Sequence, residues 1–392
     1  MALIVLILSG ILIYNCRKST LFTIMSVFMG YANYSVVMGI YLFPELRPKT
    51  LYSQITNVKV YGIGIFLLLL FMVSVLFFFP FKKIDEKDIT IAASFIKKEK
   101  FNTVLFFVLL TCFCFICIFG YSRAVSARGS SSPVYEYNTI LLLSMFYYSG
   151  DKKITRYLCY LCAAVYVLTS LFNGTRVEAV ICIFIVYLCS IKKKLPVLFI
   201  ISGLISGIIL MNFIGIFRGN YGSIVDGFRT SIQHLWKSKL VFNTCTHAYF
   251  PSLCMIEVFQ NYSFHDAVYF GSRFLSTIIM GQSRITDGDL ISYVGRTYYH
   301  NNGGWSLGFF YVWFSYLGAL LYGILLRIYA RLSTIKTTPF YQCLAIYFVA
   351  TIPRWYLYGP WSCTRGILIC SIIFGFFNQI DNLSRKKGKL LI

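Results

Sequence analysis

Residues 60–81 read VYGIGIFLLLLFMVSVLFFFPF and contain no charged side chain. A helix needs about 20 apolar residues to cross the hydrocarbon core of a bilayer, so this stretch predicts a transmembrane helix. Similar runs recur along the chain, which is 58% hydrophobic and only 13% charged, with a mean hydropathy of +0.70. Soluble domains average about 25% charged residues. The composition therefore predicts one integral membrane domain and excludes a chain of soluble domains.

We predict an all-α polytopic membrane protein with about 11 transmembrane helices (10–12), because several apolar runs are shorter than a straight span needs. Eight spans fall in residues 1–216 and three in residues 305–392, which end in a basic tail. Residues 217–304 form one large polar loop. The predicted spans are residues 1–14, 21–43, 60–81, 101–119, 137–149, 157–172, 177–190, 195–216, 305–326, 340–352 and 366–380.

Basic residues set the predicted orientation, because cytoplasmic loops are enriched in lysine and arginine. The loops that end odd-numbered spans, with the C-terminal tail, hold 16 lysines and 5 arginines, whereas the opposite loops hold 4 lysines and 11 arginines. The first set is predicted to be cytoplasmic, so the 217–304 loop lies outside. The net charge of +22 then reflects topology and gives no reason to expect a nucleic-acid partner. Outer arginines exceed what topology requires and favour an anionic ligand, since guanidinium groups grip phosphate in two places.

The large loop, residues 217–304, contains most of the candidate polar functional residues. It contains all four histidines and five of the arginines. Residues 247–257 and 266–280 are half-apolar and predict short interfacial helices, or a lid lying on the membrane. The densest polar run, residues 284–304, directly precedes the next span, so its position relative to the membrane is constrained. The cysteines lie mostly inside apolar runs, where buried cysteine acts as a small hydrophobic residue, so we expect no metal site.

Two shorter outer segments add candidates. Residues 173–178 read NGTRVE and place Arg176 and Glu178 at the edge of a span, where charged groups are costly and usually functional. The last outer loop, residues 354–365, carries Arg354 and Trp355 among other aromatic residues, which suit either a membrane-interface belt or a groove that stacks on sugar rings.

The layout and two motifs resemble the bacterial O-antigen polymerases (the Wzy family). The motifs are Gly174–Thr175–Arg176 in an outer turn and the HNNGGxSxG stretch from His300 to Gly308. Arg284 and Gly295 also fit an R-x10-G pattern of that family's outer loops. The chain departs from many relatives after the paired glycines, where they carry a glutamate and this sequence has Phe309, Phe310 and Tyr311.

The resemblance implies a glycosyltransferase that joins undecaprenyl-diphosphate-linked oligosaccharides on the periplasmic face of the bacterial inner membrane, without a cofactor. Its partners would be these lipid-linked substrates, membrane lipid and a polysaccharide chain-length regulator. Arginines would hold the diphosphate and stabilise the charge that develops as it leaves. The expected catalytic residues are His300 as the base, Arg176 and Arg284. The expected substrate-binding residues are Arg218, Arg273, Arg296, Glu178, Asp287, Asp289, Arg354 and Trp355, the two aspartates being alternative bases.

Two other functions remain open at this stage. An O-antigen ligase shares the layout and the lipid donor but transfers chains to the lipid A core. A lipid-linked oligosaccharide flippase belongs to a different class and would line a central cavity with charges from its spans. Because the predicted spans are nearly free of charge, the sequence favours an enzyme over a transporter.

Overall fold

The computed structural model shows a helical protein. It describes residues 1–47, 49–79, 102–122, 130–131, 133–150, 152–173, 176–190, 196–203, 205–206, 243–260, 263–280, 290–300, 303–335 and 338–390. Within these ranges, the only strands are the two-residue β1 (Tyr121–Ser122) and β2 (Ser130–Ser131), which pair antiparallel. Helices account for the rest of the regular structure, as the sequence predicts.

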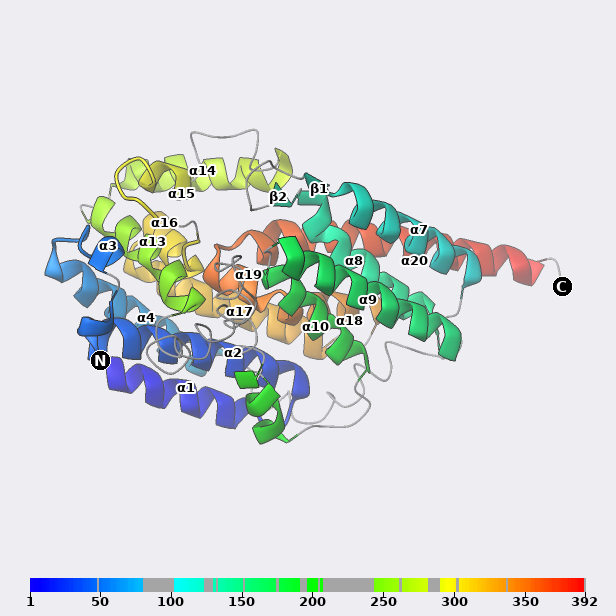
Figure 1. The fold of residues 1–392 in the computed structure, drawn as a ribbon, viewed down its shortest axis with the longest axis horizontal. Helices are drawn as coiled ribbons and strands as arrows, with labels where there is room; N and C mark the ends of the chain where they lie inside the picture. Colours follow the sequence, from blue (N-terminus) through cyan, green and yellow to red (C-terminus); the bar gives the residue numbers. More distant parts are fainter. Residues whose placement is uncertain are drawn as a thin grey trace, which may run out of the picture.

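The helices form two groups that run roughly along the long axis of the molecule (Figure 1). The first group contains α1 (Ala2–Cys16), α2 (Thr20–Val36) with its π-helical extension η1 (Val37–Leu42), α4 (Val58–Phe78), α13 (Thr244–Val258), α16 (Ser306–Phe314) and α17 (Tyr316–Ile335). The second contains α7 (Thr103–Phe119), α8 (Pro133–Tyr148), α9 (Lys153–Asn173), α10 (Arg176–Ser190) and α20 (Ile367–Leu390). Helices α18 (Pro339–Ala350) and α19 (Ile352–Leu357) contact both groups and join them.

Five further elements lie near the first group and the cavity. They are η2 (Pro44–Leu46), α3 (Lys49–Tyr52), α14 (Phe264–Met280), α15 (Leu290–Val294) and the π-helical turn η6 (Ser362–Gly366). Polar side chains define where several long helices begin: Ser19 accepts a hydrogen bond from the Phe22 amide (3.2 Å), and Asn57 and Asn102 cap α4 and α7 in the same way.

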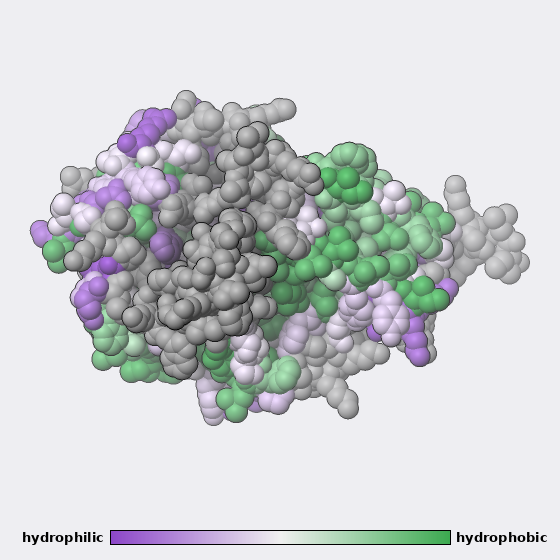
Figure 2. All heavy atoms as spheres, viewed as in Figure 1, coloured by the Kyte–Doolittle hydropathy of each residue, from purple (hydrophilic) through white to green (hydrophobic). Residues whose placement is uncertain are grey.

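The apolar surface confirms a membrane-embedded helical protein. Among the described residues, four helical stretches are long and apolar enough to cross a bilayer: Thr20–Leu42, Val58–Phe78, Lys153–Leu171 and Ser362–Ser384. Large apolar side chains are exposed along α7 and α9, where a soluble protein would place polar ones. Figure 2 shows this hydrophobic surface, with hydrophilic residues gathered toward the end of the molecule that carries α3.

The predicted span 305–326 is wrong as a single straight helix. Helix α16 ends at Phe314, Ser315 adopts a positive φ of 52°, and α17 starts at once in a new direction. The two helices pack against each other, with the rings of Phe310 and Tyr322 stacked 4.8 Å apart. A nine-residue helix is about 14 Å long and cannot cross a bilayer, so α16 is half of a helical hairpin.

Helix α13 also differs from the expectation of an interfacial helix or lid. Eleven of its residues are buried, and it packs against α2, α4 and α16 in the interior. Its start is fixed by a capping box between Asn243 and Thr246. Asn243 also donates hydrogen bonds to the hydroxyls of Tyr31 (2.6 Å) and Ser35 (2.9 Å) on α2. The half-apolar pattern of α13 therefore reflects buried polar contacts between helices.

Candidate functional site

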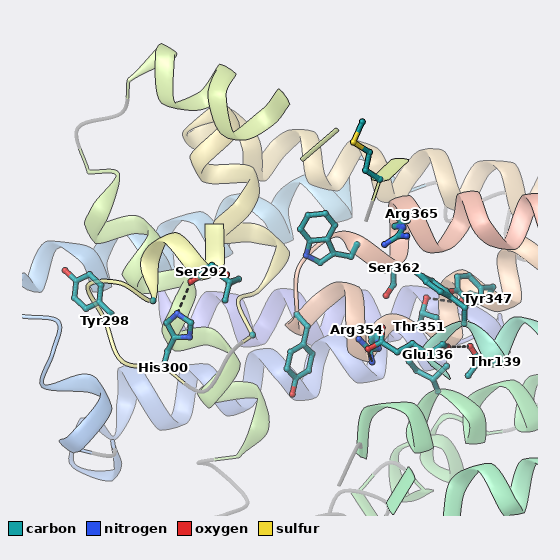
Figure 3. Close-up of a pocket in the computed structure, with 18 of the residues that line it drawn as sticks. Glu136, Thr139, Ser292, Tyr298, His300, Tyr347, Thr351, Arg354, Ser362 and Arg365 are labelled. Carbon is teal, nitrogen blue, oxygen red and sulfur yellow. Dashed lines mark hydrogen bonds and ion pairs between the residues drawn. The ribbon is translucent and has the colours of Figure 1, made fainter. Parts of the chain in front are cut away.

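A cavity of about 780 Å³ lies where the two helix groups meet. Its volume is in the range of pockets that hold small-molecule ligands. Most of its wall comes from three distant parts of the chain: the start of α8, residues 291–300 with Gly303, and the segment from α18 to η6. Ile181 of α10 and Met280 of α14 add to it. Figure 3 shows His300 and Tyr298 toward one end, and Arg354, Arg365 and Glu136 toward the other. Seven aromatic or imidazole side chains line it: Tyr137, Tyr298, Tyr299, His300, Tyr347, Tyr358 and Trp361.

Two adjacent glycines lie buried beside this cavity. Gly303 and Gly304 have φ values of +110° and +117°, which favour glycine because other residues place a Cβ against the backbone there. The Gly304 amide donates to the Ala248 carbonyl (3.0 Å), and Gly304 forms a parallel bridge with Tyr358. A Cβ on Gly304 would lie 2.7 Å from the side chain of Ile291. Non-helical backbone is thus packed among α13, α15 and α19, where its polar groups find partners within the protein.

The imidazole of His300 is held in a defined tautomer. Its Nε2 lies 3.1 Å from the carbonyl oxygen of Ile291, and a carbonyl oxygen can only accept, so Nε2 carries the proton. Nδ1 is then the ring nitrogen that takes up a proton when His300 acts as a base. The neighbouring backbone is fixed too, since Gln54 bonds both the amide (2.7 Å) and the carbonyl (2.9 Å) of Tyr299.

Tyr298 stays protonated at neutral pH. Burial, together with the hydrogen bond to the Glu257 carboxylate and its negative charge, raises the pKa of Tyr298 to about 12. Its hydroxyl is therefore a hydrogen-bond donor at this end of the cavity.

The opposite end contains a charge cluster drawn from three helices. The Arg354 guanidinium on α19 lies 2.8 Å from the carboxylate of Glu136 on α8 and is also hydrogen-bonded to Glu178 on α10. Glu178 is almost fully buried, whereas Glu136 lines the cavity. Burial raises the pKa of the Glu136 carboxyl, and the positive charge of Arg354 opposes that rise. Arg354 thus ties α8, α10 and α19 together at the cavity wall.

Arg365 reaches the same end of the cavity from the π-helical turn η6. Its guanidinium carbon lies 5.9 Å from the centre of the Tyr137 ring, a cation–π distance. Among the residues that the structure describes, no carboxylate lies within ion-pair distance of Arg365.

The structure brings some of the predicted site residues together and separates others. Arg296, His300 and Arg354 line the cavity, and Glu178 lies directly behind it. Arg273 is exposed on α14, beside Tyr269 (5.5 Å), and does not line the cavity. Trp355 is fully buried with its indole stacked on Phe348 (4.9 Å between ring centres), so it belongs to the core and not to the cavity wall.

Five predicted residues have no described side chain. Arg176 is the first residue of α10, and only its backbone is described. Arg218, Arg284, Asp287 and Asp289 lie outside the described residues. Their predicted roles stay predictions.

Glu136 and Arg365 line the cavity but were not predicted as site residues. The signal for Glu136 was weak: it is a single acid just before a predicted span, and its importance depends on Arg354, 218 residues later in the chain. Arg365 stood in the aromatic outer loop, but nothing in the sequence distinguished it from Arg354.

In the described part of the chain, no group of three or more His, Cys, Asp or Glu side chains is arranged to hold a metal ion. The described side chains that line the cavity include arginines, the Glu136 carboxylate, a histidine and aromatic rings. A scan against protein-family models and searches of curated proteins and of solved structures found no match.

Proposed function

We propose that this protein is a lipid-diphosphate-sugar-dependent glycosyltransferase that polymerises undecaprenyl-diphosphate-linked oligosaccharide repeat units, as O-antigen polymerases do. In this proposal the chain crosses the bacterial inner membrane about 11 times, with residues 217–304 on the periplasmic side and the C-terminus in the cytoplasm. The growing chain moves from its lipid diphosphate to a sugar hydroxyl of the next unit.

The observation that carries the proposal is the composition of the cavity. Arginines, a histidine and several tyrosines from regions far apart in the sequence converge on one space between the helix groups. Guanidinium groups suit a diphosphate leaving group, because they bind phosphoryl oxygens and stabilise negative charge as it develops. Aromatic faces such as Tyr358 and Trp361 suit the apolar faces of sugar rings.

The reaction needs one proton acceptor. The bond between the anomeric carbon and the diphosphate oxygen breaks, the acceptor hydroxyl forms the new glycosidic bond, and its proton must leave. Nδ1 of His300 is the nitrogen able to accept that proton, because Nε2 is already protonated toward Ile291. No nucleotide sugar is consumed.

The test uses purified protein and lipid-linked repeat units, with formation of the linked dimer as the readout. The wild-type protein should produce dimers, and His300→Ala should lower the rate by about 10²- to 10⁴-fold, the usual contribution of a general base. His265→Ala is the matched control, since His265 is exposed on α14 and does not line the cavity.

Two results would contradict the proposal. Failure of the wild-type protein to form dimers, combined with transfer of chains to lipid A core, would identify a ligase. Equal rates for His300→Ala and wild type would remove His300 as the base.

A further inference from the structure

Two arginines at the same end of the cavity have different electrostatic surroundings. Arg354 contacts two carboxylates, those of Glu136 and Glu178, so its charge is already compensated. Arg365 lies eleven residues after Arg354 in the chain. Its guanidinium lies near the ring of Tyr137, and no carboxylate of the described residues is in ion-pair contact with it. Arg354 is therefore suited to holding helices together, and Arg365 to binding a ligand.

The backbone presents Arg365 to the cavity through an unusual turn. Residues Ser362–Gly366 form a single π-helical turn, a feature that is frequent at functional sites. Trp361, Ser362 and Arg365 of this segment all line the cavity. The turn and the residue before it thus present these three side chains to the cavity.

Side chains from other helices fix this turn. The Tyr329 hydroxyl of α17 donates to the carbonyl of Cys363. Gly366 packs against Tyr347, since a Cβ there would lie 2.7 Å from the Tyr347 hydroxyl oxygen. Because the turn is held from two sides, Arg365 is positioned before any ligand arrives.

We infer that Arg365, with Ser362 and Tyr137 beside it, is the subsite for the anionic diphosphate of an isoprenoid-linked substrate, and that Arg354 is not. This inference rests on the proposed function and deepens it by assigning the leaving-group end of the cavity. Arg365 provides charged donors for phosphoryl oxygens, and the hydroxyls of Ser362 and Tyr137 can donate beside it. Met280 and Ile181 add apolar wall to the cavity, against which the first isoprenoid carbons would lie.

Substitution of Glu136 is a control that should change diphosphate affinity in the opposite direction to substitution of Arg365. Its carboxylate lines the cavity near Arg365 and attracts that guanidinium electrostatically. An incoming diphosphate would therefore compete with Glu136 for Arg365. Removing the charge of Glu136 should strengthen diphosphate binding, whereas removing the charge of Arg365 should weaken it.

The experiment measures binding of farnesyl diphosphate to the full chain in detergent by isothermal titration calorimetry, with inorganic pyrophosphate as a second probe. Arg365→Gln should weaken farnesyl diphosphate binding by about 10- to 100-fold, the usual effect of losing a hydrogen-bonded charge. Glu136→Gln should tighten it several-fold. Arg331→Gln, an exposed arginine of α17 that does not line the cavity, should leave it unchanged.

The outcomes separate the inference from the proposed function. Binding of farnesyl diphosphate by wild type that is unaffected in Arg365→Gln would overturn the inference and leave the function standing. Absence of binding by wild type would count against the proposed function itself. If Arg365→Gln does not fold, Glu136→Gln decides: weaker binding by that variant would overturn the inference. Equal affinity for pyrophosphate and farnesyl diphosphate would show that the subsite binds the diphosphate and that the isoprenoid chain adds no affinity.

Discussion

Arg354 lies between two carboxylates that come from different helices. Glu178 is buried and contacts the guanidinium of Arg354, and Glu136 contacts the same guanidinium at the cavity wall. Taking charges out of water is costly, and the cost is recovered only while all partners are present. At the scale of single residues, this cluster is therefore the most sensitive point of the described structure.

Arg354→Gln should destabilise the protein by about 3–5 kcal/mol, because it leaves two carboxylates without a counter-charge. Thermal unfolding in detergent, followed by circular dichroism, measures the effect. The double variant Arg354→Gln/Glu178→Gln should regain part of the loss, since the buried charge is then gone. A double variant as unstable as the single one would show that the cluster acts by packing and not by charge.

The hairpin of α16 and α17 is the feature of a single element that sequence reasoning missed. Hydrophobicity continues through residues 305–326, but the backbone reverses at Ser315. The reversal needs a close approach of the two helices: a Cβ on Gly318 would lie 2.0 Å from the carbonyl oxygen of Phe310. It places Trp305 in the interior, where its indole donates to the Cys245 carbonyl (3.1 Å).

Gly318→Ala should destabilise the protein by about 1–3 kcal/mol or more, because the clash is with backbone that cannot rotate away. Chemical or thermal unfolding in detergent provides the measurement. Gly62→Ala on α4 is the matched control, since a Cβ there meets nothing within 4 Å, and it should change stability by less than about 1 kcal/mol. Equal effects of the two substitutions would contradict the tight packing of the hairpin.

At the scale of the whole molecule, the cavity exists because two helix groups meet through α18 and α19. Residues within 291–300, and Gly303, line the cavity at that junction from the predicted outer loop, whereas α20 leads away from it toward the C-terminus (Figure 1). The proposed function therefore requires the residues around Tyr299 to face the periplasm and the end of α20 to face the cytoplasm.

Cysteine labelling checks this orientation. Tyr299→Cys, at a position 73% exposed, should react with a membrane-impermeant maleimide in right-side-out membrane vesicles. Asn382→Cys, exposed near the end of α20, should react only after permeabilisation. Wild-type protein controls for background: its exposed Cys112 and Cys114 lie on the apolar helix α7, where a polar reagent has poor access. Labelling of Asn382→Cys without permeabilisation would overturn the topology.

Most helix positions were determined by the sequence alone, because a hydrophobic run and its polar caps are local. Eight of the predicted spans coincide with described helices to within four residues at each end, as residues 101–119 do with α7 and 340–352 with α18. Glu178 was predicted as a candidate because a charge at the edge of a span is costly, and Arg354 because it lies in the aromatic outer loop. Only the tertiary structure decided that they pair with each other and with Glu136, that α13 is buried, and that the chain reverses at Ser315. These features depend on contacts between residues up to 218 positions apart and on the space around Gly318. Neither kind of contact produces a periodic pattern that could be recognised in the sequence.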